Sequence, residues 1–181
     1  MNLVGERVYL RPLEKRDLPI IINWGKNPDL QRFMDGEYPQ TIDEGEVWLE
    51  ETKKNRHAVL VGIVTKDGRL IGDIELSHIS WRRGDCELRI RIGEDADRNR
   101  GFGTDALSTI LEYAFLQLGL KLVYLRVYSF NQRAIRCYEK CGLRKRGRLW
   151  RRSGNMAQEI ILMQIQDDQF IASRKPGSAT G

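Results

Sequence analysis

Apolar and polar residues alternate along several short stretches of this chain, and each stretch predicts a β-strand. The alternation is clear over residues 86–92, where Leu88, Ile90 and Ile92 share one face and charged residues occupy the other. The same pattern predicts strands at residues 7–11, 57–65, 70–80, 122–128, 143–152 and 156–165. Residues 66–69 and 153–155 contain the glycines of tight turns and therefore predict two hairpins.

A period of three to four residues replaces the alternation in four other segments, which we predict to be helices. The strongest carries one apolar stripe from Leu107 to Leu118 and ends at Gly119, a residue typical of helix C-termini. The other three cover about residues 17–24, 41–54 and 131–142, each opened by a residue that can cap a helix N-terminus. After residue 166 neither period continues.

The order of these segments predicts a single-domain α/β (α+β) fold with a mixed, mostly antiparallel sheet of about seven strands flanked by about four helices. Hairpins make their strands antiparallel, whereas the strand, helix and strand over residues 86–128 require parallel pairing. A chain of 181 residues can form one such domain without disulfides. We expect the domain to cover residues 1–166 and residues 167–181 to form a flexible tail.

The turn before the strongest helix has the chemistry of an anion site. Gly101 and Gly103 let the backbone N–H groups approach an anion, and the start of the helix adds partial positive charge. Arg98 and Arg100 flank these glycines. No Lys-Ser/Thr pair follows as in a P-loop, and the three-glycine spacing of dinucleotide-binding turns is absent.

Composition narrows the class of protein. The sequence has no apolar run of membrane-spanning length and no apolar signal segment, so we expect a cytoplasmic protein without a membrane partner. Three cysteines and two histidines indicate neither a disulfide framework nor a metal site. The net charge is +5, with a dense basic region over residues 144–152. We favour a charge-guarded sheet edge there and expect no nucleic-acid partner.

Two motifs in the chain resemble those of the GNAT superfamily of acyltransferases. The donor motif of that family, Arg/Gln-x-x-Gly-x-Gly/Ala, is matched by Arg98, Gly101 and Gly103. Residues 131–143 are similar to the family's Asn-x-x-Ala-x-x-x-Tyr-x-x-x-Gly-Phe segment, with Leu143 in place of the aromatic residue. The resemblance covers about residues 5–166. Within the superfamily, residues 5–13 and the helix with Trp24 resemble the ribosomal-protein N-terminal acetyltransferases and the related spermidine acetyltransferases.

The resemblance implies acetyl-coenzyme A (acetyl-CoA) as the donor and no metal. It implies that the strand ending at residues 90–92 hydrogen-bonds the pantetheine arm and that the glycine turn holds the diphosphate. The implied donor-binding residues are Ile90, Ile92, Arg98, Asn99, Arg100, Gly101, Phe102, Gly103, Thr104, Asn131 and Arg133. Arg136 and Lys140 could reach the nucleotide phosphate or simply face solvent.

The resemblance also suggests the catalytic groups. Tyr138 matches the family's general acid, which would protonate the departing thiolate, although a core tyrosine can have a purely packing role. A base must accept the proton of the attacking amine. Arg126 occupies a position where relatives may carry Glu, so we take Glu87 as the candidate base and Glu75 as the second. Either could instead be a surface carboxylate paired with arginine.

We therefore predict an acetyl-CoA-dependent N-acetyltransferase that acts on a primary amine, with the N-terminal amine of a ribosomal or other protein as the leading acceptor. A spermidine-like polyamine or another small amine is the alternative. Acidic residues at the expected acceptor entrance would suit a polyamine: Asp35, Glu37, Asp43 and Glu44. A non-catalytic acyl-CoA-binding or nucleic-acid-associated module stays open as a second class of function, and so does a homodimer.

Overall fold

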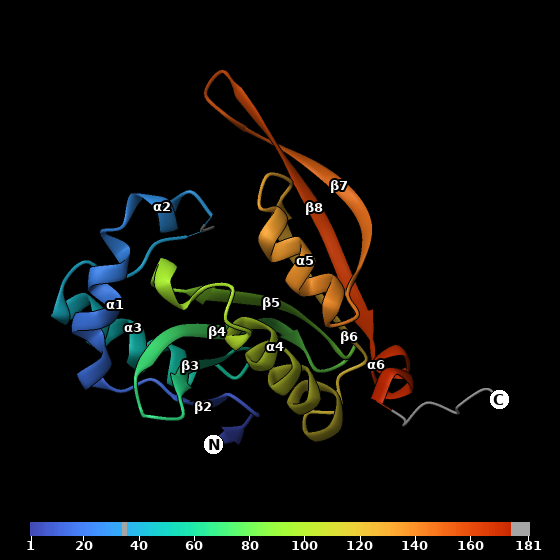
Figure 1. Ribbon diagram of the computed structural model, residues 1–181, viewed down its shortest axis with the longest axis horizontal. Coiled ribbons are helices and arrows are strands. Elements are labelled where there is room, and N and C mark those ends of the chain that lie inside the picture. The colour runs from blue at the N-terminus through green and yellow to red at the C-terminus, as the bar shows by residue number, and fades with distance from the viewer. Residues whose placement is uncertain (34–35, 175–181) are drawn as a thin grey trace.

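The protein folds around one mixed β-sheet (Figure 1). The computed structural model describes residues 1–33 and 36–174. The strands are β1 (Leu3–Val4), β2 (Val8–Pro12), β3 (Val59–Thr65), β4 (Leu70–Ser80), β5 (Asp85–Ile92), β6 (Leu122–Tyr128), β7 (Arg144–Ser153) and β8 (Met156–Gln166). Their order in the sheet is β1-β2-β3-β4-β5-β6-β8-β7, and only β5 and β6 pair in parallel. The predicted fold class is confirmed, with the two-residue β1 as an additional strand.

Four of the six described α-helices lie at the positions that the apolar periodicity predicts. The α-helices are α1 (Leu18–Gly25), α2 (Pro28–Gln31), α3 (Ile42–Lys54), α4 (Phe102–Glu112), α5 (Gln132–Lys140) and α6 (Asp167–Arg174). A π-helical turn, Tyr113–Gln117, extends α4 toward Gly119, which has the positive φ of 69° that the predicted C-terminal cap requires. The four predicted helices α1, α3, α4 and α5 are therefore present.

Two short helices were not predicted. α2 is four residues long and begins at Pro28, where Asn27 accepts a hydrogen bond from the Asp29 backbone N–H at 3.0 Å. The expectation that regular structure ends at residue 166 is corrected by α6, whose Phe170 is buried against Phe115. One buried aromatic in eight residues gives no readable period. Residues 175–181 of the expected tail lie outside the described residues.

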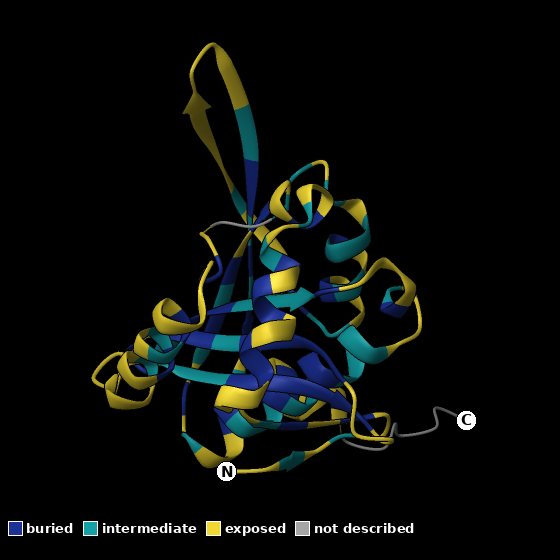
Figure 2. Ribbon diagram, turned by 90° about the vertical axis from the view of Figure 1, so that its left-hand side faces the viewer, coloured by how far each residue is buried: buried dark blue, intermediate teal, exposed yellow. Residues whose placement is uncertain are grey.

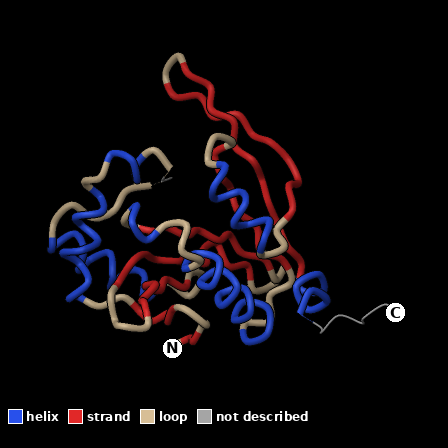
Figure 3. The backbone as a smooth tube through the Cα atoms, in the orientation of Figure 1, coloured by secondary structure: helices blue, strands red, loops and turns tan. Residues whose placement is uncertain are grey.

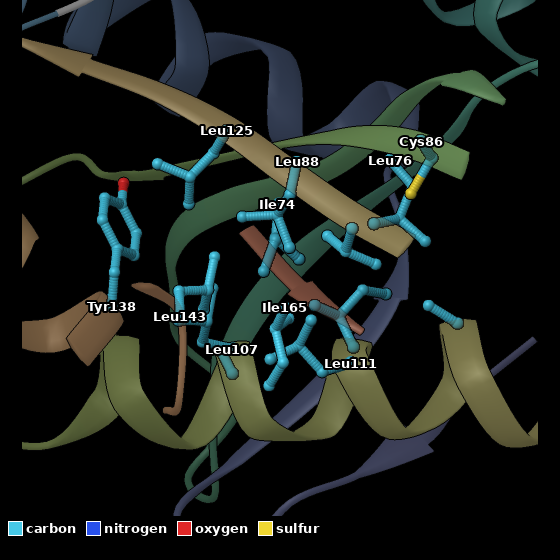
Figure 4. Close-up of a cluster of buried hydrophobic side chains, with 14 of the residues drawn as sticks. Ile74, Leu76, Cys86, Leu88, Leu107, Leu111, Leu125, Tyr138, Leu143 and Ile165 are labelled. Carbon is cyan, nitrogen blue, oxygen red and sulfur yellow. The ribbon is translucent and has the colours of Figure 1, made fainter. Parts of the chain in front are cut away.

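Helices cover both faces of the sheet. Strand β3 illustrates why, because Val61 and Ile63 pack toward α4 and α5 while Leu60 and Val64 pack toward α1 and α3. Figure 4 shows side chains of α4, including Leu107 and Leu111, against those of the central strands. In Figure 2 the buried residues follow the sheet and the inner sides of the helices, whereas the β7–β8 hairpin projects with largely exposed residues.

The sheet divides between β5 and β6. These strands pair only over residues 85–87 and 122–124, whereas β4 stays paired with β5 as far as Ile92 and β8 with β6 as far as Tyr128. Beyond the pairing the two halves of the sheet diverge (Figure 3). Helices α4 and α5 both begin close to this opening, as the residues that line it show.

Candidate functional site

The opening between β5 and β6 is a cleft with a volume of ≈ 370 Å³. Its walls are residues 88–92 of β5, residues 126–128 of β6, the turn before α4 and the first turns of α5. Seven basic residues line it: Arg89, Arg91, Arg98, Arg126, Arg133, Arg136 and Lys140. Asp97 is its one acidic residue within the part of the chain that the structure describes. The lining is therefore suited to an anionic ligand.

The turn before α4 offers free backbone amides to the cleft. Gly101 is the N-cap of α4 and adopts the left-handed φ of 80°, which glycine tolerates best. The N–H groups of Phe102, Gly103 and Thr104 are the first three of the helix and have no intrahelical acceptor. No hydrogen-bond acceptor for them occurs among the described residues. These amides and the helix dipole form the anion cradle that the sequence predicts.

The two arginines that flank the cradle are held by the protein itself. The side chain of Arg98 is 9% exposed, forms an ion pair with Asp95 and donates to the Ile92 carbonyl at 3.3 Å. Arg100 Nη1 lies 3.6 Å from Asp97 Oδ1, and the Arg100 guanidinium packs over the Phe102 ring. Both arginines therefore fix the shape of the turn, whereas the sequence suggests only that they flank the ligand.

Arg133 is the cation of the cleft that most needs an anion. Its side chain has no ion-pair or hydrogen-bond partner within residues 1–33 and 36–174. Burial, together with the nearby positive charge of Arg98, lowers the pKa of Arg133. Because a bound phosphate would remove both penalties, Arg133 is well placed as a phosphate ligand.

The cradle is anchored by two carboxylates that the sequence analysis did not single out. Asp97 is buried and accepts hydrogen bonds from both terminal nitrogens of Arg69, at 2.7 and 2.8 Å. These bonds lower the pKa of Asp97 despite its burial. Asp105 in α4 accepts from the backbone N–H groups of residues 6–8 at 2.8 to 3.0 Å. The N-terminal segment and the β3–β4 hairpin thus hold the turn in place.

Tyr138 reaches the same cleft from α5. Its ring is buried and lies beside Leu143 in Figure 4, and the residue lines the cleft. Its hydroxyl has no hydrogen-bond partner among the described residues. Burial raises the pKa of Tyr138, so the phenol stays protonated near neutral pH and can donate a proton or a hydrogen bond.

The N-cap of α5 and a further residue of this helix also line the cleft. Asn131 caps α5 by accepting from the Ala134 N–H at 3.3 Å and lines the cleft. Cys137 Sγ lies 3.3 Å from the Thr104 hydroxyl, beside the cradle. Hydrogen bonds from Cys141 and Thr104 outweigh burial and lower the pKa of the Cys137 thiol to about 7. The sequence analysis did not single out Cys137.

The two candidate bases are paired with arginines. Glu87 is buried, with Oε1 2.8 Å from Arg126 Nε and Oε2 3.4 Å from His78 Nδ1. Glu75 Oε2 lies 4.0 Å from Arg89 Nε, a looser contact. Both arginines line the cleft, and neither glutamate does. His78, with a strained φ of 52°, is a neighbour of Glu87 that sequence spacing did not reveal.

The loop expected to form the acceptor entrance is pinned to the sheet. Tyr38 donates a hydrogen bond to the buried Asp73, which also binds Arg91 at 2.5 Å. The expected acidic entrance does not line the cleft: Glu37, Asp43 and Glu44 are exposed elsewhere, and Glu44 accepts from the Gln40 N–H at 2.9 Å. Asp35 lies outside the described residues.

The family model of the GNAT acetyltransferase domain matches residues 7–144 of this chain. The chain is a member of the GNAT acetyltransferase family. Among its relatives, spermidine N(1)-acetyltransferase of Vibrio cholerae is 29% identical over 147 residues, covering 81% of this chain and 84% of that protein. The Escherichia coli K12 spermidine N(1)-acetyltransferase is 28% identical over 177 residues, with 94% and 92% covered.

The similarity extends to the structure. The crystal structure of the Vibrio cholerae spermidine N-acetyltransferase in complex with CoA and spermine superposes with a TM-score of 0.83 at 26% identity, covering 91% of this chain and 98% of the other. As a GNAT acetyltransferase, the protein uses acetyl-CoA as its donor, which confirms the expected cofactor. The cradle amides and Arg133 fit its diphosphate, and the unpaired edge of β5 fits the amides of its pantetheine arm. None of the described helices is both long and apolar enough to span a membrane.

Proposed function

We propose that this GNAT acetyltransferase acetylates a primary amine of a polyamine of the spermidine class. The observation that carries the proposal is the single cleft in which the cradle amides and the buried Tyr138 hydroxyl are brought together. Relatives named as spermidine N-acetyltransferases that match nearly the whole chain support the polyamine acceptor. They favour this alternative of the sequence analysis over its first choice, the N-terminal amine of a protein.

In this proposal the cradle and the basic residues bind the donor. The amides of Phe102, Gly103 and Thr104 hold the diphosphate, with Arg133 as a charged partner. Ile90 and Ile92 present the edge of β5 to the pantetheine arm, and Asn131 contacts the arm from the start of α5. The thioester would then point toward the closed end of the cleft, because the strands meet there.

Tyr138 serves as the general acid. The amine attacks the thioester carbonyl, the tetrahedral intermediate collapses, and the carbon–sulfur bond breaks. The Tyr138 hydroxyl gives its proton to the departing thiolate, and solvent restores that proton. Its raised pKa keeps it protonated until the sulfur acquires charge.

Glu87 serves as the proton acceptor for the amine, in contact with His78. The Glu87 carboxylate takes the amine proton through a bridging water once the Arg126 side chain has moved aside, since Glu87 itself does not line the cleft. Oε2 of Glu87 faces the exposed His78 imidazole, which offers the proton a route to solvent. Glu75 is the second choice because its arginine contact is looser.

The basic cleft favours a second candidate acceptor, the N-terminal amine of a protein. Polyamines carry several positive charges, and acidic groups should surround their binding site. Asp97, the one acidic residue among the described cleft residues, is already bonded to Arg69. A peptide with a single N-terminal amine would meet less repulsion from Arg89, Arg91 and Arg126.

An acceptor panel tests the proposal. Purified protein is mixed with acetyl-CoA and each of spermidine, spermine, an aminoglycoside and peptides with ribosomal-protein N-termini, and release of the CoA thiol is measured. We expect the largest kcat/KM with spermidine or spermine. Turnover with peptides alone would favour the second candidate, whereas no thiol release with any amine would contradict both. A reaction without amine controls for acetyl-CoA hydrolysis.

A further inference from the structure

The positive charge of the protein is concentrated on one projecting hairpin. Residues 144–159, which we call the basic arm, contain six basic residues and one acidic residue, an excess of +5. The net charge of the whole chain is also +5, so the other residues together are neutral. The six basic residues are Arg144, Lys145, Arg146, Arg148, Arg151 and Arg152.

The arm stands away from the body of the protein. Strand β7 is the outermost strand of the sheet, pairs on one side only with β8, and has nine exposed residues of ten (Figures 1 and 2). Trp150 and Met156 are 67% and 69% exposed. Guarding a sheet edge against aggregation explains the arginines. The need to guard the edge does not explain why the Trp150 ring on the same strand is exposed to solvent.

One face of the arm borders a groove. The groove has a volume of ≈ 340 Å³ and lies between the arm and α5. Its charged lining residues are the basic Lys145, Arg146 and Arg148 and the acidic Glu159, and the polar Ser129 and Gln132 also line it. Arg148 is opposite Ile161 in the strand register, which places Trp150 and Arg152 on the same face of β7. Cations, hydrogen-bond donors and an aromatic ring therefore follow one strand face.

Within the described chain, four of the six charges of the arm have no ion-pair partner or only a weak one. Arg146 and Arg152 have no ion-pair partner among the described residues. Lys145 and Arg148 make long pairs, at 3.9 Å with Glu139 and 3.4 Å with Glu159, and exposed pairs of this kind contribute little. Ten strand residues span roughly 30 Å, so one small anion cannot neutralise them.

We propose that the basic arm binds single-stranded nucleic acid, with phosphates on the arginines of β7 and a base stacked on Trp150. Phosphate contacts and base stacking on exposed aromatic rings are the two interactions on which such binding relies. A second copy of this chain is a poorer occupant, because the arm repels another arm and the rest of the chain has no net negative charge to attract it. This inference reverses the expectation from sequence and does not depend on which amine is acetylated.

The test is fluorescence anisotropy with a labelled 20-nucleotide oligouridylate. With about four phosphates neutralised, the affinity should fall ~50-fold between 50 and 200 mM salt. The double variant R146A/R152A should reduce the slope of log affinity against log salt by about half. W150A should weaken binding roughly tenfold at constant salt.

The matched control is R82A/R83A, which removes the same charge from the β4–β5 turn and should leave affinity within about twofold. Unchanged melting temperature and CoA binding establish that each variant is folded. The proposal is overturned if the oligonucleotide does not bind, if binding ignores salt, or if R82A/R83A weakens it as much as R146A/R152A. Arm-dependent binding to anionic phospholipid vesicles, or arm-dependent dimerisation, without oligonucleotide binding would also overturn it.

Discussion

The donor side and the acceptor side of the cleft are built in different ways. In the function that we propose, the groups on the donor side belong to the backbone, in the amides at the start of α4 and along the free edge of β5. On the acceptor side they are charged side chains that already bind one another, such as Glu87 with Arg126 and Asp73 with Arg91. The donor side is therefore preformed for its ligand, whereas an acceptor amine must compete with existing ion pairs.

This difference implies that the backbone fold determines donor binding, whereas individual side chains determine which amine is accepted. Acetyl-CoA needs a fixed anion cradle, which a left-handed Gly101 and a helix N-terminus provide in any sequence that folds this way. Amine specificity depends on which carboxylate becomes free when the amine enters. We expect donor binding to survive most side-chain changes and acceptor use to be sensitive to them.

We expect the largest loss of activity at Tyr138, whose hydroxyl lies between the donor side and the acceptor side of the cleft. Tyr138→Phe should lower kcat about 100-fold, because the departing thiolate loses its acid, while the affinity for CoA stays within twofold. Steady-state kinetics and calorimetric titration with CoA measure the two quantities. Tyr128→Phe, at another tyrosine of the cleft, is the matched control and should change kcat little. Equal activity of Tyr138→Phe and the original protein would remove Tyr138 from the mechanism.

The acceptor side is tested by its glutamates. Glu87→Gln should lower kcat by about 10- to 100-fold, because the amine loses its proton acceptor. Glu75→Gln should reduce the rate by less than about threefold, and both variants should bind CoA normally. If Glu75→Gln shows the large loss and Glu87→Gln the small one, the roles of the two residues are reversed.

The anchor of the donor side should affect stability rather than chemistry. Asp97→Asn should lower the free energy of unfolding at pH 7 by about 1–2 kcal/mol, a value discounted because Arg69 is half exposed. The pKa of Asp97 is lowered in the folded protein. Its contribution is therefore present above the ordinary pKa of about 4 and is lost as the pH falls through the lower folded value.

Urea unfolding of the Asp97→Asn variant at pH 7 and pH 3 measures this contribution, and the difference from the original protein should shrink at the lower pH. Asp167→Asn, which removes an exposed pair with Lys121, is the control and should change stability by less than about 0.5 kcal/mol. A destabilisation that is the same at both pH values would contradict the linkage.

The smallest effect concerns the thiol beside the cradle. Because the pKa of Cys137 is about 7, its alkylation by iodoacetamide should accelerate severalfold between pH 6 and pH 8, and saturating CoA should slow it. Mass spectrometry of the modified peptides follows the reaction. Burial raises the pKa of Cys86 to about 12, so Cys86 provides an unreactive internal control. No protection of Cys137 by CoA would argue that the donor does not reach Thr104.

The sequence predicts the secondary-structure elements and the glycine turn, because both depend on the local pattern of residues. The bounds of β4 and β6 agree with the alternation of apolar residues, and the glycine turn identifies the cradle because backbone conformation requires glycine there. The sequence does not predict contacts between distant side chains. Glu87 meets Arg126 across 39 residues, and Tyr38 meets Asp73 across 35, through a fold that brings β4, β5 and β6 together. The short α2 and α6 were missed because four or eight residues carry too little periodicity.

A crystal structure of the protein with bound CoA is the most direct test of the central claim. We expect the diphosphate oxygens to lie about 3 Å from the backbone nitrogens of Phe102, Gly103 and Thr104, with the pantetheine arm along β5 and the thiol directed toward the Tyr138 hydroxyl. Electron density that places the diphosphate away from this turn, or no bound CoA at saturating concentration, would contradict the account.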